Sequence, residues 1–278
     1  MSTPPDRLAG GAVAHVLAHE LGAHRRTFLR WVIPMAALLA MVAALQPSMA
    51  GDGGVLAAKL AAMPAAFRRA FGLEAFDLAR PAGYLATYFV YVSLTAALLG
   101  ASLGATLVAK EEARRTGELL LTQPVARTQV LLGKAGAAAI YAVAYNLVLA
   151  VVAIVALAIA VDGPAQASLI AGMFAGAAAL GVCFAGVGML VATLGREPRG
   201  AAQVAMGVVL AAYLVGAVAA IAPAAHALGY LSPFRAVMPA DVIAGGGAAP
   251  LPLIALVAVG VVAAAAAIAR YARKDIHA

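Results

Sequence analysis

Six long apolar runs constrain this chain more than any other feature of its sequence. Crossing the hydrocarbon core of a bilayer, about 30 Å thick, takes roughly 20 helical residues. A spanning segment has to be helical, because lipid offers no partner for exposed backbone groups. Only 11% of the 278 residues are charged, against about 25% in a typical soluble domain. We therefore expect an all-α integral membrane protein, with residues 1–278 forming a single transmembrane domain. The expected spans are Trp31–Met49, Tyr84–Ala109, Ala135–Val161, Ala167–Leu194, Gln203–Ala222 and Leu251–Ala269.

The distribution of Lys and Arg predicts how the spans are oriented. If both termini lie in the cytoplasm, the inner segments hold 14 of the 19 Lys and Arg residues and the outer segments hold five. Cytoplasmic segments carry this excess of positive charge. We therefore expect both termini on the cytoplasmic side of the cell's inner membrane. The formal net charge of +7 then lies on that side, so a nucleic-acid partner is not needed to explain it.

Three segments outside the spans have patterns of their own. The N-terminal residues up to the Arg25, Arg26 and Arg30 cluster are expected to form an amphipathic helix on the inner membrane surface. In the first outer segment, five apolar residues between Leu56 and Phe71 recur on one helical face. The last outer segment, Pro223–Pro250, is apolar but interrupted by proline, which predicts a re-entrant segment.

Glycine and proline positions within the runs give further expectations. Gly100–Gly104 and Gly172–Gly176 have the GxxxG spacing that lets membrane helices approach closely. Pro34 is expected in the first turns of the first span, where a missing backbone N–H costs least. The tyrosines that open the second span are expected to form an aromatic belt at the outer interface.

Several chemistries are missing from the sequence. No GxxxxGK[ST] phosphate-binding loop occurs, so the chain is not expected to hydrolyse ATP or to be an enzyme by itself. His15, His19, Glu20 and His24 do not match the HExxH order of zinc proteases, although a metal-dependent membrane enzyme stays an alternative. We expect no metal and no cofactor on this chain. Cys183 stands alone and offers no disulfide or thiolate site.

The predicted spans contain almost no ionisable side chain, although such residues mark ion pathways in many secondary transporters. A secondary transporter therefore remains only an alternative, and energy for transport is expected to come from another subunit. Asn146 is the most notable polar residue within a span. It is expected either to form an interhelical hydrogen bond or to contact a substrate on the translocation path.

The segment Lys110–Lys134 contains eight of the chain's 31 charged residues. Its first part continues the second span as a helix, with Glu and Arg residues spaced for pairs three or four positions apart. Gln123-Pro124 then breaks the helix, and a second helix is expected to start at Pro124 and to run into the third span. This gives a helix–break–helix elbow on the cytoplasmic side.

The letters of this elbow, "EEARRTGELLLTQPVARTQVLLGK", resemble the cytoplasmic segment between the second and third spans of ABC-2 type transporter permeases. The segment "LSPFRAV" and the six-span layout are also similar to that family, although Thr116-Gly117-Glu118 departs from the common "GTLE" form. The resemblance implies a permease subunit of an ABC exporter that pairs with a second copy or a homologue. Each permease would dock on a separate ATPase subunit, which binds ATP and Mg²⁺. The residues implied in this coupling are Glu111, Glu112, Thr116, Glu118, Pro124, Val125, Arg127 and Lys134. A permease-like subunit that supports assembly or sensing without transport is the other alternative, and the substrate is not readable.

Overall fold

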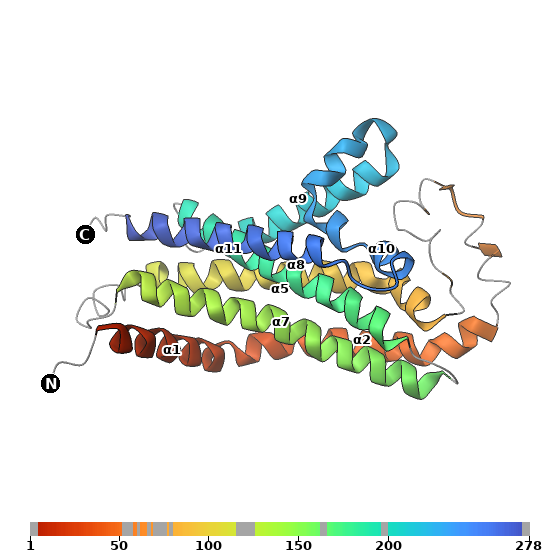
Figure 1. Ribbon diagram of the computed structural model, residues 1–278, viewed down its shortest axis with the longest axis horizontal. Helices are drawn as coiled ribbons and strands as arrows, with labels where there is room; N and C mark the ends of the chain where they lie inside the picture. Colours follow the sequence, from red (N-terminus) through yellow and green to blue (C-terminus); the bar gives the residue numbers. More distant parts are fainter. Residues whose placement is uncertain are drawn as a thin grey trace.

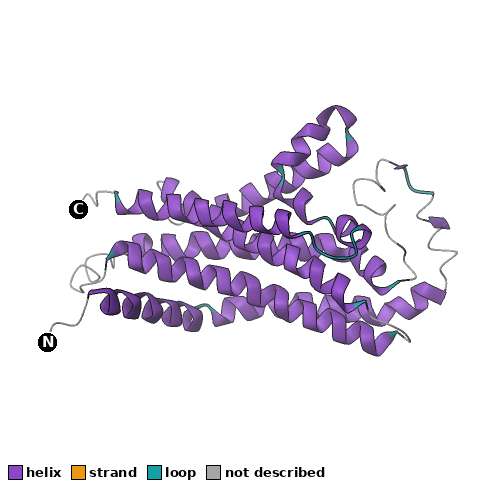
Figure 2. Ribbon diagram, in the orientation of Figure 1, coloured by secondary structure: helices purple, strands orange, loops and turns teal. Residues whose placement is uncertain are grey.

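We analysed a computed structural model of the chain. It describes residues 5–51, 80–114, 126–161, 166–195 and 200–273, together with residues 58, 59, 62–65, 68 and 77. Among these residues every regular element is a helix (Figure 2). The predicted helical face between Leu56 and Phe71 lies mostly outside the described residues.

The described helices confirm the all-α prediction and its six spans. Six helices are long and apolar enough to cross a membrane, and the fourth, Ala167–Leu194, has the predicted bounds. The elements are α1 (Pro5–Ala23), α2 (Arg25–Gly51), α5 (Pro81–Arg114), α7 (Arg127–Ala160), α8 (Ala167–Leu194), α9 (Ala201–Ile221), η3 (Pro223–Leu231), η4 (Pro233–Val237), α10 (Pro239–Ala244) and α11 (Pro250–Ala272).

Two helices begin earlier than hydropathy alone predicts. α2 starts at Arg25, so the expectation for Pro34 is wrong: it lies in the helix interior rather than in the first turns. α7 starts at Arg127 and continues to Ala160 without interruption, so its predicted start at Pro124 is three residues too early, because Ala126 has an extended backbone. The residues Arg25–Arg30 contain no proline or glycine, so α2 extends through them.

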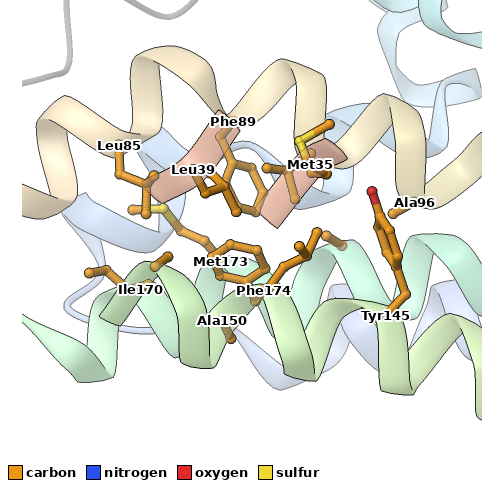
Figure 3. Packing of buried hydrophobic residues seen from close by; sticks show 14 of the residues in the cluster. Met35, Leu39, Leu85, Phe89, Ala96, Tyr145, Ala150, Ile170, Met173 and Phe174 are labelled. Atoms are coloured by element: carbon orange, nitrogen blue, oxygen red, sulfur yellow. The ribbon is translucent and has the colours of Figure 1, made fainter. Parts of the chain in front are cut away.

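The bundle is organised around α8, which packs against α5, α7, α9 and α11, while α2 packs on α7 (Figure 1). One core cluster joins Leu39 of α2, Phe89 of α5, Tyr145 of α7 and Phe174 of α8. Figure 3 shows these side chains meeting between the helices. The rings of Phe89 and Phe174 meet edge to face, with their centroids 5.3 Å apart.

Glycines make the contact between α5 and α8 very close. A β-carbon at Gly100 would overlap the carbonyl oxygen of Gly181, and one at Gly104 would overlap that of Ala185. The first GxxxG pair is therefore a true helix contact, as its spacing predicts. The second pair, Gly172 and Gly176, faces the outer segment that joins α9 to α11.

That outer segment turns back on α9. η3 packs along α9 (Figure 1), and the buried Ser232 at its end donates a hydrogen bond from Oγ to the carbonyl oxygen of Ala212, 2.8 Å away. Ala212 lies near the middle of α9. The chain thus returns about 13 Å along the helix, at 1.5 Å per residue. Membrane re-entry by this segment stays a prediction.

Gln166, which precedes α8 at the same end of the bundle, contacts the start of α5. Gln166 adopts a left-handed backbone conformation with φ of 50°. Its side-chain Oε1 accepts a hydrogen bond from the backbone N–H of Ala82, at 3.1 Å. The first turn of a helix leaves its N–H groups without helical partners, and Gln166 supplies one of them for α5.

Candidate functional site: a buried carboxylate between two lysines

α1 is packed against the bundle. It runs along the first part of α7 (Figure 1), and a β-carbon at Gly133 of α7 would come within 3.0 Å of Val13 and Val16 on α1. Gly133 therefore lets the two helices approach. His15 and His19 remain exposed on the other side of α1. A separate helix lying on the membrane surface is not confirmed and stays a prediction.

The packed face of α1 carries a carboxylate, Glu20, which is only 4% exposed. Its Oε1 lies 3.1 Å from Nζ of Lys134 on α7. Its Oε2 lies 3.7 Å from Nζ of Lys110 on α5 and 3.5 Å from Nε2 of His24. The imidazole is beyond good hydrogen-bonding distance, so the Lys134 ammonium is the principal partner of this carboxylate.

The surroundings of Glu20 favour its charged form. Burial by itself raises the pKa of Glu20. The contact with His24 and the positive charges of Lys134 and Lys110 outweigh that effect and lower the pKa from 4.5 to about 2. Opposite charges within a few ångströms shift a carboxyl pKa in this direction. Glu20 is therefore ionised at neutral pH.

Lys134 connects three helices at once. Its side chain is 1% exposed, and besides Glu20 it donates to the carbonyl oxygen of Leu107 on α5, at 2.6 Å. Beside it, the hydroxyl of Tyr141 on α7 donates to the carbonyl oxygen of Leu21 on α1. The Tyr141 ring also packs on Phe28 of α2, with centroids 5.1 Å apart. A set of polar contacts thus fixes α1 to the adjoining ends of α5 and α7.

These two ends belong to the charged elbow of the sequence. Lys110 lies near the end of α5 and Lys134 follows the start of α7, so both sides of the elbow meet at Glu20. We call Glu20, Lys110 and Lys134 the Glu20 cluster. With one carboxylate and two ammonium groups, it has a formal charge of +1.

The other predicted coupling residues are only partly visible. Glu111 and Glu112 lie in the last turn of α5, and Arg127 is the first residue of α7, but their side chains are outside the described residues. The remaining predicted residues are entirely outside the described residues: Thr116, Glu118, Pro124 and Val125. Lys134 is described, and its ammonium contacts this chain's own α1 and α5.

Sequence reasoning missed Glu20 and Lys110 as members of a site. A signal for Glu20 was present, because it follows Val13, Val16 and Leu17 on one face of α1 at helical spacing. A single carboxylate on an apolar face requires a buried cation. Nothing in the sequence alone identifies that cation as Lys134, 114 positions away.

Asn146 is buried on α7, 1% exposed. Its Nδ2 donates to the carbonyl oxygen of Ala142 in the same helix, at 2.9 Å, so the predicted interhelical hydrogen bond is absent. Its Oδ1 has no hydrogen-bond partner within the part of the chain that the structure describes. An unpaired buried acceptor of this kind costs about 1–3 kcal/mol of stability.

A metal centre finds no support among the residues that the structure describes. No three His, Cys, Asp or Glu side chains within them lie close enough together to bind a metal ion. His15 and His19 are exposed, while Nε2 of His24 lies 3.5 Å from Oε2 of Glu20.

A comparison with protein families matches residues 14–276 to the model of the ABC-2 family transporter proteins. The chain belongs to the ABC-2 transporter family. The match covers α1 from Ala14 onward and all six spans, so the resemblance extends from the elbow to nearly the whole chain. A search of curated proteins found no match.

Membership of the ABC-2 family gives the six-span bundle its role. The chain is an integral membrane protein and a permease component of an ABC transporter, and such a component is not itself catalytic. ABC-2 permeases generally work with ABC ATPase partners. The Glu20 cluster lies at the base of the segment that resembles the family's contact with that partner.

Proposed function

We propose that this chain is the permease subunit of an ATP-driven exporter, energised by a separate ATPase subunit that binds ATP and Mg²⁺. It works with a second copy of itself or with a homologue in the cytoplasmic membrane, with both termini in the cytoplasm. The family match and the near absence of charge in the spans support a transporter whose energy comes from a partner.

The observation that carries this proposal is the convergence of both ends of the elbow on one buried carboxylate. Because Glu20 pairs with Lys134 and lies near Lys110, a displacement of the elbow is transmitted to α1, α5 and α7 together. Seven residues of the elbow contact the ATPase: Glu111, Glu112, Thr116, Glu118, Pro124, Val125 and Arg127. Lys134 has a positioning role, since it connects this contact to the bundle.

The test is ATP hydrolysis and transport by the purified complex. The permease is purified with its ATPase subunit and reconstituted in proteoliposomes, and the double variant Pro124→Gly with Arg127→Glu is compared with the wild type. We expect the variant to insert into the membrane normally but to lose ATP-driven transport. Arg273→Glu, a charge reversal at the exposed end of α11, is the control and should leave transport unchanged.

Two results would contradict the proposal. The first is full transport by the permease alone, driven by an ion gradient, which would indicate a secondary transporter. The second is a complex that forms and hydrolyses ATP but moves no compound across the membrane under any condition. That result would favour the alternative of a non-transporting assembly or sensing subunit.

The orientation of the chain in the membrane has a separate test, which relies on Cys183, the single and buried cysteine, not reacting with the label. Arg26→Cys lies in the first turn of α2, and Ala249→Cys directly precedes α11; both positions are exposed. In intact cells, a membrane-impermeant maleimide should label the variant at position 249 only. Labelling at position 26 only would show that the orientation is reversed.

A further inference from the structure

A pocket lies between α8 and the segment that joins α9 to α11, at the end of the bundle where α8 and α11 begin (Figure 1). Gly172 and Gly176 of α8 line one wall, and η4, α10 and the start of α11 line the other. Its volume is about 280 Å³, roughly twice the 150 Å³ of a dry protein cavity that holds a benzene molecule. We call this cavity the α8 pocket, and it has room for part of a hydrocarbon chain.

The α8 pocket reaches the depth of lipid tails. From Ala167, the first residue of α8, to Gly176 the helix rises about 14 Å at 1.5 Å per residue. All 28 residues of α8 rise about 42 Å, which exceeds a hydrocarbon core of about 30 Å by roughly 12 Å. Even if this whole excess lies at the Ala167 end, Gly176 is inside the hydrocarbon region. The pocket therefore extends from the membrane surface into the layer of acyl chains.

The lining of the α8 pocket is apolar with one charged place. Val237, Val242 and Leu253 contribute hydrocarbon surface, and the hydroxyl group of Ser232 is already used by the carbonyl oxygen of Ala212. Among the described residues that line the pocket, only Arg235 and Asp241 are charged. A mostly apolar wall with a few polar groups is typical of sites for small molecules. Here the combination suits an amphiphile with one charged end.

The two charged side chains determine which headgroup fits. Nη1 of Arg235 donates to Oδ2 of Asp241 at 3.0 Å and also lies 3.1 Å from Sδ of Met238. A guanidinium group has five N–H donors and a carboxylate has about four acceptor positions. Nε and Nη2 of Arg235, and Oδ1 of Asp241, therefore stay available within the described part of the chain. Both side chains are well exposed, at 45% and 65%, so a headgroup can approach them.

The pair as a whole is neutral, which matters for the charge of the ligand. An anionic headgroup gains from Arg235 but is repelled by Asp241. A zwitterionic headgroup that carries a phosphate and an ammonium group gains from both, because each of its charges meets an opposite one. Guanidinium binds phosphate in a well-defined geometry, and an ammonium group with N–H donors can hydrogen-bond the carboxylate.

The surface around the α8 pocket indicates that the ligand comes from the membrane. Tyr230, which lines the pocket, is 79% exposed, and its chain neighbour Leu231 is 74% exposed. Leu251, next to the lining residue Pro252, is 76% exposed. Large apolar side chains gathered on a surface mark a contact with a membrane or a partner, and tyrosine is common at the level of lipid headgroups.

We propose that the α8 pocket binds a zwitterionic phospholipid with a primary ammonium group, phosphatidylethanolamine. Arg235 binds its phosphate, Asp241 binds its ammonium group, and part of one acyl chain lies along Gly172 and Gly176. The bound lipid holds the segment between α9 and α11 against α8. This inference does not depend on the proposed transport function.

The test measures lipid binding to the delipidated full chain in detergent by native mass spectrometry. Phosphatidylethanolamine, phosphatidylcholine and phosphatidylglycerol with identical acyl chains are titrated one at a time. Asp241→Asn removes the carboxylate, and Ala236→Phe adds a ring at an exposed position that lines the pocket. The control is Asp77→Asn, which removes the carboxylate of another exposed pair. Its Oδ2 lies 3.2 Å from Nε of Arg80, just before α5, and neither residue lines the pocket.

We expect the wild type to bind phosphatidylethanolamine most tightly and phosphatidylglycerol least. Asp241→Asn should weaken phosphatidylethanolamine by about fivefold, the upper range for one exposed ion pair, and should strengthen phosphatidylglycerol, because the site then has a net positive charge. Ala236→Phe should weaken all three lipids alike, since they share the acyl chain. Asp77→Asn should leave both affinity and preference unchanged.

Three results would overturn the inference. The first is a wild type that binds phosphatidylglycerol as tightly as phosphatidylethanolamine. The second is the same change of preference with Asp77→Asn as with Asp241→Asn, which would indicate a general effect of charge. The third is unchanged lipid binding by Ala236→Phe, and if that variant also lost a dimer seen for the wild type, a second copy of the chain would be the occupant.

Discussion

Replacing Glu20 with glutamine is the most direct perturbation of the Glu20 cluster. The change removes one negative charge and keeps the shape of the side chain. Lys134, which is 1% exposed, then loses the carboxylate that lies 3.1 Å from its Nζ. We expect α1 to loosen from the bundle while the six spans stay in place.

The structure sets the size of this effect. The pKa of Glu20 falls from 4.5 to about 2, and each unit corresponds to about 1.4 kcal/mol between the two protonation states. The native surroundings therefore favour the carboxylate by about 3 kcal/mol. Removing one partner of a buried ion pair costs about 3–5 kcal/mol. We expect Glu20→Gln to lower the free energy of unfolding by about 3 kcal/mol.

The assay is unfolding in detergent, followed by the fluorescence of Trp31. This is the only tryptophan of the chain, and it packs against the core cluster that contains α2. Glu20→Gln, Lys134→Met and the double variant form a cycle. Because each single variant removes one partner of the same ion pair, the double variant should lose about 1–3 kcal/mol less than the sum of the two.

The control is an exposed ion pair in the segment between α9 and α11. Arg235 Nη1 and Asp241 Oδ2 lie 3.0 Å apart, with side chains 45% and 65% exposed. An exposed pair contributes less than about 1 kcal/mol, so Asp241→Asn should have little effect. The reasoning is refuted if Glu20→Gln costs less than about 0.5 kcal/mol, or if its effect and that of Lys134→Met are additive.

Three further predictions concern acid stability, helix packing and Asn146. Since the native pKa of Glu20 is depressed, its contribution to stability is complete above pH 4.5 and is lost as the pH falls toward 2; the difference between wild type and Glu20→Gln should therefore shrink over that interval, and a constant difference would contradict it. Gly104→Val should prevent the close approach of α5 and α8 and so reduce the yield of folded protein in size-exclusion chromatography. Gly207→Ala is the control, because Gly207 has open space around it, and it should not reduce that yield. Equal yields of the two variants would argue against the contact. Asn146→Leu should raise the thermal unfolding midpoint, because it removes a buried oxygen that has no partner, and a lower midpoint would show that this oxygen is paired.

Hydropathy predicted the spans because lipid leaves few alternatives to a long apolar helix. It placed the start of α2 too late, because Arg25–Arg30 contain no proline or glycine and the helix continues through them. Proline placement predicted that α7 begins before its apolar run, although the helix starts at Arg127 rather than at Pro124. The GxxxG contact at Gly100 and Gly104 was also predictable, because small residues are what close packing requires.

The Glu20 cluster was not predictable in the same way. Its carboxylate and its ammonium come from helices that are distant in sequence, and only the folded bundle brings them together. The coupling role of the elbow residues stays a prediction, and it depends on the family resemblance.

The hydrogen bond from Ala82 to Gln166 has a mechanical consequence. It fastens one end of α5 to the turn between α7 and α8, while Lys134 of α7 fastens the other end through the carbonyl oxygen of Leu107. A piston-like slide of α5 would break both fastenings at once. A tilt of α5, α7 and α8 as one rigid block would break neither. We therefore expect this permease to rock rather than to slide, with its less buried helices moving around that block.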